Sequence, residues 1–282
     1  MITLKNDRIE VSIAERGAEM RRLTLDGNDV LWSGDPAYWT GVAPLLFPIC
    51  GGLKDNRYTA GGREYTMELK HGYARTSDFT LEKRTCNSVT LLLTSTPETL
   101  ECYPWNYELR VTYSLRGTAL EIGYEVKNTD SSTMYFSIGS HEAYACPEGL
   151  EDYDIIFPQN ETLNSFELEG SLLKHSTLPI LKNARVLPLY EKYFAVDALV
   201  FKDIKSRAAT LRNRKTGREI TVEFPGCRYL LFWTKPGAGY ICIEPWGGIP
   251  PMVDDGAAIE EKEGIESLSA GDIFRRSHTI YF

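Results

Sequence analysis

The feature that most constrains the fold is an alternation of apolar and polar residues with a period of two. It recurs in seven short segments, namely Ile9–Ile13, Phe79–Lys83, Val89–Thr94, Tyr107–Leu115, Leu120–Val126, Ile220–Phe224 and Ile273–Tyr281. This period is typical of β-strands with one buried face. Helical periodicity is limited to single turns near Pro97–Cys102 and Ala257–Lys262. The pattern predicts an all-β chain built from antiparallel strands.

Turn signals between these segments support antiparallel pairing. Asp26-Gly27, Gly61-Gly62, Arg116-Gly117 and Thr216-Gly217 suit tight hairpins. The 282 residues contain no linker-like stretch and no repeat of fixed period. We therefore expect a single domain over residues 1–282. A phosphate-binding glycine motif is also missing, so nucleotide binding through such a loop has no support.

The overall charge argues against a nucleic-acid partner. The formal net charge is −8, whereas phosphate binding needs clustered Lys and Arg. The most basic stretch, Arg207–Arg218, contains a Lys-Thr-Gly turn signal and predicts a solvated hairpin. The N-terminus does not resemble a signal peptide, and no apolar run is long enough to span a membrane. We expect a cytoplasmic protein without membrane contact.

Six cysteines are scattered along the chain without a CxxC pair. This spacing favours reduced thiols that serve in packing over a disulfide framework or a zinc site. The sequence thus predicts neither a metal nor another cofactor.

Two of the four histidines have settings that suit a functional site. His71 is followed by Gly72, which would let a ligand or another backbone segment approach closely. The alternative is an imidazole held by a nearby carbonyl group. His141 follows a strand-like run and the small residues Gly139 and Ser140, so its side chain could face a cleft. His175 and His278 have no comparable setting, and we interpret both as surface or packing residues.

Glu244 is a carboxylate inside the apolar segment Tyr240–Trp246. Burial of a carboxylate is costly unless it is compensated. Desolvation by Ile243 and Trp246 would raise its pKa toward neutrality, as a general base requires. A structural salt bridge is the alternative. Arg57 lies fourteen residues before His71 across the Gly61-Gly62 turn, so a hairpin could place the two on one rim.

Five motifs, taken in order, resemble those of the aldose 1-epimerase (galactose mutarotase) family, and more closely its LacX-like branch. The similar segments are Phe47-Pro48 with Asn56-Arg57, His71-Gly72-Tyr73-Ala74-Arg75, Ser137–His141, Ile243-Glu244-Pro245-Trp246 and Gly264–Gly271. They cover roughly residues 45 to 282. Glu142 stands where the family often has a proline, a departure that bears on the shape of the cleft beside His141.

This resemblance implies a galactose mutarotase-like antiparallel β-supersandwich with an open sugar cleft. It implies an isomerase of carbohydrate metabolism that interconverts the α and β anomers of a free aldohexose. Glu244 would act as general base and His141 as general acid. The residues that would bind the sugar are Arg57, His71, Arg75, Asp197, Tyr144 and Trp246. A small sugar is the expected partner, with a homodimer as one possible assembly.

Three other functions remain open on the sequence. A hexose-6-phosphate mutarotase could use Arg75, Arg57 and Lys54 as a phosphate clamp. A sugar-binding or sensing protein would keep the cleft without catalysis. A glycosidase would need two well-placed carboxylates, and Glu244 alone has a convincing setting.

Overall fold

A computed structural model describes residues 1–195 and 197–282. Its strands pair antiparallel, as the alternation predicts. All seven alternating segments form strands, and the predicted hairpin turns join paired strands. The helical turns are short, and both predicted ones are present. They are α1 (Pro97–Cys102), η1 (Lys54–Asn56), η2 (Ala74–Thr76), η3 (Leu150–Asp152), η4 (Glu191–Phe194) and η5 (Ile259–Glu261). No described helix is long and apolar enough to cross a membrane.

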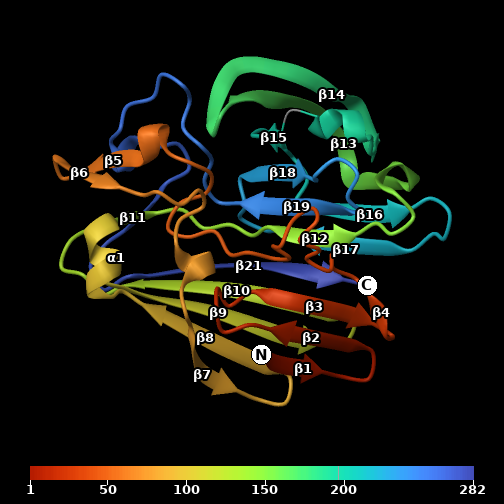
Figure 1. The fold of residues 1–282 in the computed structure, drawn as a ribbon, viewed down its shortest axis with the longest axis horizontal. Helices are drawn as coiled ribbons and strands as arrows, with labels where there is room; N and C mark the ends of the chain where they lie inside the picture. Colours follow the sequence, from red (N-terminus) through yellow and green to blue (C-terminus); the bar gives the residue numbers. More distant parts are fainter. Residues whose placement is uncertain (196) are drawn as a thin grey trace.

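The largest sheet has nine strands, with β14 (Leu172–Pro188) at one end and β7 (Thr80–Arg84) at the other. It curves around three shorter strands, β12 (Glu142–Ala145), β18 (Tyr229–Trp233) and β19 (Tyr240–Trp246) (Figure 1). In spatial order its strands are β14 (Leu172–Pro188), β13 (Tyr153–Glu169), β16 (Ala208–Asn213), β17 (Glu219–Glu223), β21 (Ile273–Tyr281), β10 (Ala119–Asn128), β9 (Tyr107–Arg116), β8 (Ser88–Thr94) and β7 (Thr80–Arg84).

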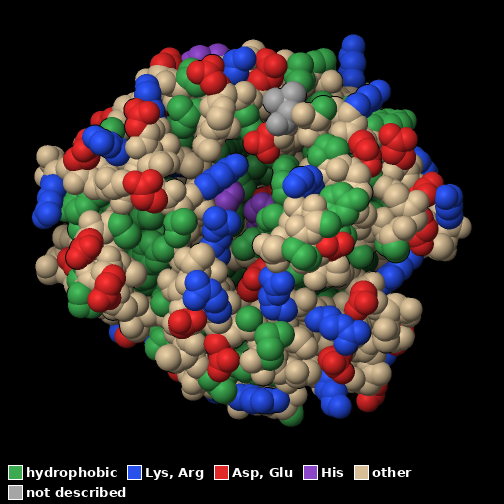
Figure 2. Space-filling model, in the orientation of Figure 1, with side chains coloured by type: hydrophobic (Ala, Val, Ile, Leu, Met, Phe, Trp, Pro, Cys, Tyr) green, Lys and Arg blue, Asp and Glu red, His purple; other side chains and the backbone are tan. Residues whose placement is uncertain are grey.

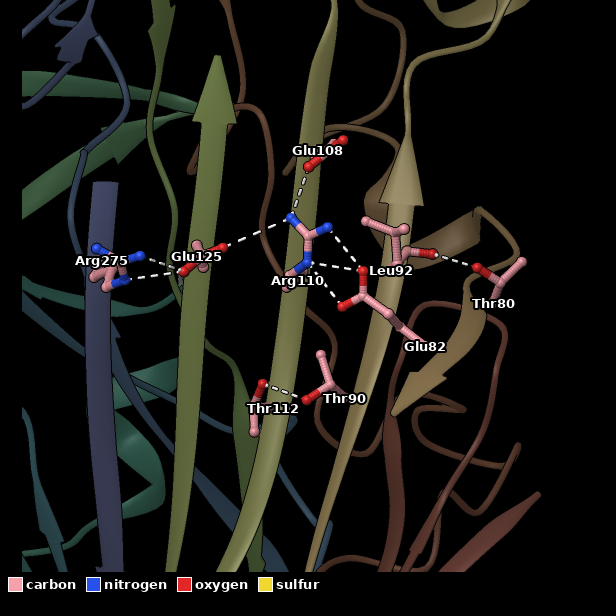
Figure 3. Close-up of polar contacts among 9 residues, drawn as sticks. All are labelled: Thr80, Glu82, Thr90, Leu92, Glu108, Arg110, Thr112, Glu125 and Arg275. Carbon is pink, nitrogen blue, oxygen red and sulfur yellow. Dashed lines mark hydrogen bonds and ion pairs between the residues drawn. The ribbon is translucent and has the colours of Figure 1, made fainter. Parts of the chain in front are cut away.

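A group of ion pairs joins several strands of this sheet (Figure 3). Arg110 on β9 contacts Glu82 at 2.7 Å, Glu108 at 2.8 Å and Glu125 at 3.6 Å. Arg275 on β21 contacts Glu125 at 2.8 Å. These pairs link β7, β9, β10 and β21, so opposite charges face one another across the sheet as stable pairing requires.

A four-stranded sheet, called the site sheet below, lies against the inner face of the large sheet. Its order is β12 (Glu142–Ala145), β19 (Tyr240–Trp246), β18 (Tyr229–Trp233) and β15 (Leu199–Phe201). Every residue of β19 is buried, because its strand is covered on both faces. Phe232 of β18 packs on Phe157 of β13 with ring centroids 6.4 Å apart. One main apolar cluster includes buried residues from Ile2 to Ile280.

Smaller sheets complete the fold. The N-terminal segments form a four-stranded sheet whose neighbouring loop accepts a hydrogen bond from Tyr113 of β9. Its strands are β1 (Ile2–Lys5), β2 (Ile9–Ile13), β3 (Met20–Leu25) and β4 (Asn28–Asp29). Two pairs stand apart, β5 (Arg57–Ala60) with β6 (Arg63–Thr66) and β11 (Met134–Phe136) with β20 (Glu266–Leu268).

The cysteines are free thiols, and four of the six are buried. Cys86 is exposed and Cys102 is half-buried, so the packing role predicted for all six applies to the four buried ones. The basic stretch Arg207–Arg218 forms the β16–β17 hairpin as expected.

Candidate active site

A cavity of about 190 Å³ opens on the site sheet. Figure 2 shows histidine side chains in a hollow near the centre of the view, with Lys and Arg side chains at its edge. The side chains that line the cavity come from six separate parts of the chain. They are Trp39, Lys70, His71, Arg75, His141, Asp197, Ala198, Leu231, Trp233, Glu244 and Trp246.

His141 and Glu244 face each other at the base of this cavity. The register that pairs Glu142 with Ile243 brings His141, one residue before β12, opposite Glu244 of β19. His141 Nε2 lies 3.3 Å from Glu244 Oε2. The glutamate is 1% exposed and the histidine 8%. Gly139 permits this arrangement, since a Cβ there would lie 2.9 Å from the Trp246 ring.

Burial opposes the charged form of both groups. It raises the pKa of Glu244 well above its usual value, and the negative charges of Glu142 and Asp197 act in the same direction. It lowers the pKa of His141 to about 3, helped by the positive charges of Lys70 and Arg75. Burial thus favours a neutral carboxyl group beside a neutral imidazole over an ion pair.

His71 occupies a loop whose backbone is hydrogen-bonded to Phe47 and Gly51 of the neighbouring segment. Its backbone has a φ of +71°, an uncommon conformation for a residue with a side chain. Its Nδ1 accepts a hydrogen bond from the Gly51 N–H at 3.0 Å. A Cβ on Gly72 would lie 2.3 Å from the Phe47 carbonyl oxygen, so the close approach expected there is made by backbone. Burial lowers the pKa of His71 well below its usual value, and the neutral ring keeps its proton on Nε2.

Three charged side chains surround the acid–base pair. Arg75 comes from η2 beside His71, and its buried Nε has no hydrogen-bond partner within the described residues. Burial lowers the pKa of Arg75. Asp197 also lines the cavity, and its Oδ1 accepts a hydrogen bond from the Ala198 N–H at 2.9 Å. Lys70, which sequence reasoning did not include among the sugar-binding residues, stands directly before His71.

Aromatic rings form the walls. Trp246 meets His71 edge to face with centroids 5.3 Å apart, and its Nε1 donates to the Ser140 carbonyl at 3.1 Å. Trp39 and Trp233 lie 5.1 Å and 5.7 Å from the His141 ring. Sequence reasoning missed both. The available signal was a tryptophan after the Gly34-Asp35-Pro36 turn signal and another at the end of the apolar run Tyr229–Trp233.

Arg57 does not line this cavity, contrary to the expected shared rim with His71. It lines a separate cavity of about 530 Å³ together with Lys54. Alternation along β5 buries Tyr58 and turns Arg57 outward, where it pairs with Glu64 at 3.1 Å. The Gly61-Gly62 hairpin is present as predicted, but the face of the strand on which Arg57 lies separates it from His71.

Tyr144 is also absent from the cavity lining. It follows His141 by three residues, and side chains three apart on a strand point to opposite faces. Tyr144 is fully buried in the main apolar cluster between the sheets. Of the predicted site residues, the structure thus brings together Glu244, His141, His71, Arg75, Asp197 and Trp246.

Three donor atoms in this region could together hold a metal ion. One ligand atom from each of His141, Cys242 and Glu244 lies within 4.8 Å of the others. Cys242 and Glu244 are two residues apart on β19, so their side chains share one face of the strand. The pairing of β12 with β19 adds His141, which lies about a hundred residues earlier and could not be linked to them from local spacing.

Antiparallel sheets that carry a buried histidine–glutamate pair in an aromatic-walled cavity place this protein in the galactose mutarotase-like class of β-supersandwiches. The chain belongs to the aldose 1-epimerase family, whose model matches residues 1–277.

Three relatives match this chain over nearly its whole length. It is 34% identical to the chromosomal protein LacX of Lactococcus lactis subsp. lactis, covering 99% of this chain and 98% of LacX. A galactose mutarotase-like protein from Lactobacillus casei superposes with a TM-score of 0.93 at 30% identity, covering 100% and 99% of the two chains. A galactose mutarotase related enzyme from Lactobacillus acidophilus gives 0.91 at 30% identity, covering 99% and 96%.

Proposed function

We propose that this protein is an aldose 1-epimerase that interconverts the α and β anomers of a free aldohexose. The observation that carries the proposal is the buried pair of His141 and Glu244, 3.3 Å apart, in a cavity with aromatic walls. Family membership supports the same reaction class. The two groups provide a proton acceptor and a proton donor within reach of one small ligand.

In the reactive form the shared proton lies on His141 and Glu244 is ionised. Glu244 accepts the proton of the C1 hydroxyl while the bond between C1 and the ring oxygen breaks. His141 donates its proton to the ring oxygen, which leaves an open-chain aldehyde. Rotation about the C1–C2 bond presents the other carbonyl face, and reclosure returns each proton to its origin. The proton balance closes, and each positioned group contributes roughly 10²–10⁴-fold in rate.

The remaining lining residues hold the sugar. His71 can donate through Nε2 to a sugar hydroxyl because its Nδ1 is occupied by Gly51. Asp197 can accept from hydroxyl groups, and Arg75 can donate to them. The ring of Trp246 offers an apolar surface to the sugar ring. Such positioning lowers the entropy cost of reaching the transition state.

A second candidate substrate is a sugar phosphate. Lys70 and Arg75 both line the cavity, and neither makes an ion pair in the part of the chain that the structure describes. The clamp predicted from Arg75, Arg57 and Lys54 is not assembled, because the last two line the separate larger cavity. We favour the free sugar, since Asp197 and Glu244 would repel a phosphate group close to the reacting atoms.

Polarimetry of freshly dissolved α-anomers tests the proposal. We expect faster mutarotation of at least one common aldohexose, and a higher kcat/KM for the free sugar than for its 6-phosphate. A preference of about tenfold for the phosphate, equal to 1.4 kcal/mol, would favour the second candidate. Sugar binding without any rate effect would instead indicate a non-catalytic sugar-binding protein.

A further inference from the structure

Cys242 lies close to the acid–base pair although it does not line the cavity. Alternation along β19 puts it on the same side of the strand as Glu244. It is fully buried in a small cluster with Ala143 and Tyr240. The thiol is therefore buried within 4.8 Å of a ligand atom of both His141 and Glu244.

The three donor atoms are close to the arrangement that a tetrahedral zinc ion needs. They all lie within 4.8 Å of one another, and His141 Nε2 is 3.3 Å from Glu244 Oε2. Zinc binds sulfur at about 2.3 Å and nitrogen or oxygen at about 2.0–2.2 Å. In a tetrahedral site any two ligand atoms are therefore less than about 4 Å from each other. A contraction of about 1 Å would complete the site. Thiolate, imidazole and carboxylate are also the ligand types that zinc prefers.

Unpartnered polar atoms point to a ligand at the same place. Both carboxylate oxygens of Glu244 are buried without a hydrogen-bond partner among residues 1–195 and 197–282. Buried polar atoms normally have such partners, and an exception calls for an explanation such as an ion. A cation bound here would satisfy donor atoms that the protein itself leaves free.

We propose that His141, Cys242 and Glu244 form a zinc-binding site that blocks the acid–base pair when occupied. Zinc would take the lone pairs of the carboxylate and the imidazole and release the thiol and carboxyl protons to solvent. The fourth position would face the cavity and hold water. A bound ion would then exclude proton transfer at C1, so the metal acts as an inhibitor and not as a cofactor.

Metal binding can be measured without reference to mutarotation. Co²⁺ bound to a thiolate gives a charge-transfer absorption in the near ultraviolet, which reports the sulfur ligand directly. We expect this absorption in the unaltered protein and its loss on addition of Zn²⁺. Cys242→Ala should abolish it. Cys146→Ala is the matched control, because Cys146 is an equally buried free thiol outside the three-residue group, and it should keep the absorption.

Inhibition provides the second readout, with each variant compared with its own metal-free rate. Zn²⁺ should inhibit the unaltered protein and Cys146→Ala, and EDTA should restore both. Cys242→Ser should require at least about tenfold more Zn²⁺, the lower end of what a lost supporting partner costs. No absorption at all, or an absorption that persists in Cys242→Ala and in Cys242→Ser, would overturn the proposal. Binding without detectable mutarotation would overturn the proposed function alone.

Discussion

At the scale of single residues, the central feature is one proton shared by His141 and Glu244. Burial disfavours both the imidazolium and the carboxylate, yet the reaction needs one group protonated and the other free. Only the singly protonated pair meets this requirement. The pH dependence of the reaction is therefore set by the pair and not by either side chain alone.

The directions of the two pKa shifts predict a broad pH optimum. The second proton would bind His141, whose pKa is lowered to about 3, so kcat/KM should stay level as pH falls from about 8 to about 5. The first proton leaves Glu244, whose pKa is raised, so activity should fall only on the alkaline side. Polarimetry in EDTA, which keeps the pair free of metal, measures this profile. A loss of kcat/KM on the acid side, centred near the ordinary histidine pKa of about 6.5, would contradict this prediction.

Arg75 and Arg57 lie in separate cavities, so we expect alanine substitution to affect sugar binding at Arg75 and not at Arg57. Arg75 lines the active-site cavity, so Arg75→Ala should raise KM for the sugar by roughly tenfold, as loss of about 1–2 kcal/mol of hydrogen bonding implies. Arg57→Ala removes only an exposed ion pair with Glu64 and should leave KM and kcat within about twofold. Steady-state kinetics of both variants decide this. An equal rise in KM in the two variants would show that Arg57 also contributes to sugar binding.

Local context identified part of the site but not all of it. An apolar strand around a carboxylate marked Glu244, and small residues after a strand marked His141. Arg57 and Tyr144, predicted to bind the sugar, do not line the cavity, because the motif alone does not tell which face of a strand each side chain takes. Trp39 and Trp233 were missed because contacts made between distant segments leave no local signal.

At the scale of elements, strand β12 connects the active site to the interior. Its alternation sends Glu142 to the face opposite His141. There Glu142 Oε1 lies 3.1 Å from Nε2 of His278 on β21, and both residues are buried. His278, predicted to be a surface or packing residue, thus packs between the two sheets. Tyr124 stacks on its ring at 5.8 Å.

This pair predicts non-additive stability changes. His278→Leu should lower the free energy of unfolding by about 3–5 kcal/mol, because Glu142 keeps a buried carboxyl group without its partner. Glu142→Leu should also destabilise. The double substitution should cost clearly less than the sum of the single changes. Urea denaturation of the four proteins measures the coupling, and additive changes would show that the two side chains act independently.

The sequence predicted regular strands well and irregular ones poorly. Strands β8, β9 and β10 alternate cleanly because one face is buried along nearly their whole length. Strand β7 was predicted from the same alternation although all of its residues are exposed. The seventeen-residue strands β13 and β14 were not predicted. Their pairing is interrupted by four register shifts, and β14 is largely exposed, so apolar residues do not recur at a constant period.

At the scale of the whole molecule, the site depends on two sheets packed together. The large sheet supports the inner face of the site sheet, and the outer face carries the cavity. The all-β class and the antiparallel pairing could be predicted from periodicity. The order of the strands could not, since partners such as β13 with β16 are joined by long connections that leave no mark in local patterns.

The most direct test of the account is the kcat of Glu244→Gln. Glutamine keeps the size and hydrogen-bonding ability of the side chain but removes the proton acceptor. We expect kcat for the best aldose to fall by roughly 10²-fold or more, with His141→Asn lowering it similarly. Circular dichroism should show an unchanged β-sheet spectrum in both variants. If Glu244→Gln kept more than about a tenth of the original kcat, Glu244 would not be the base, and Asp197 would be the next carboxylate to test.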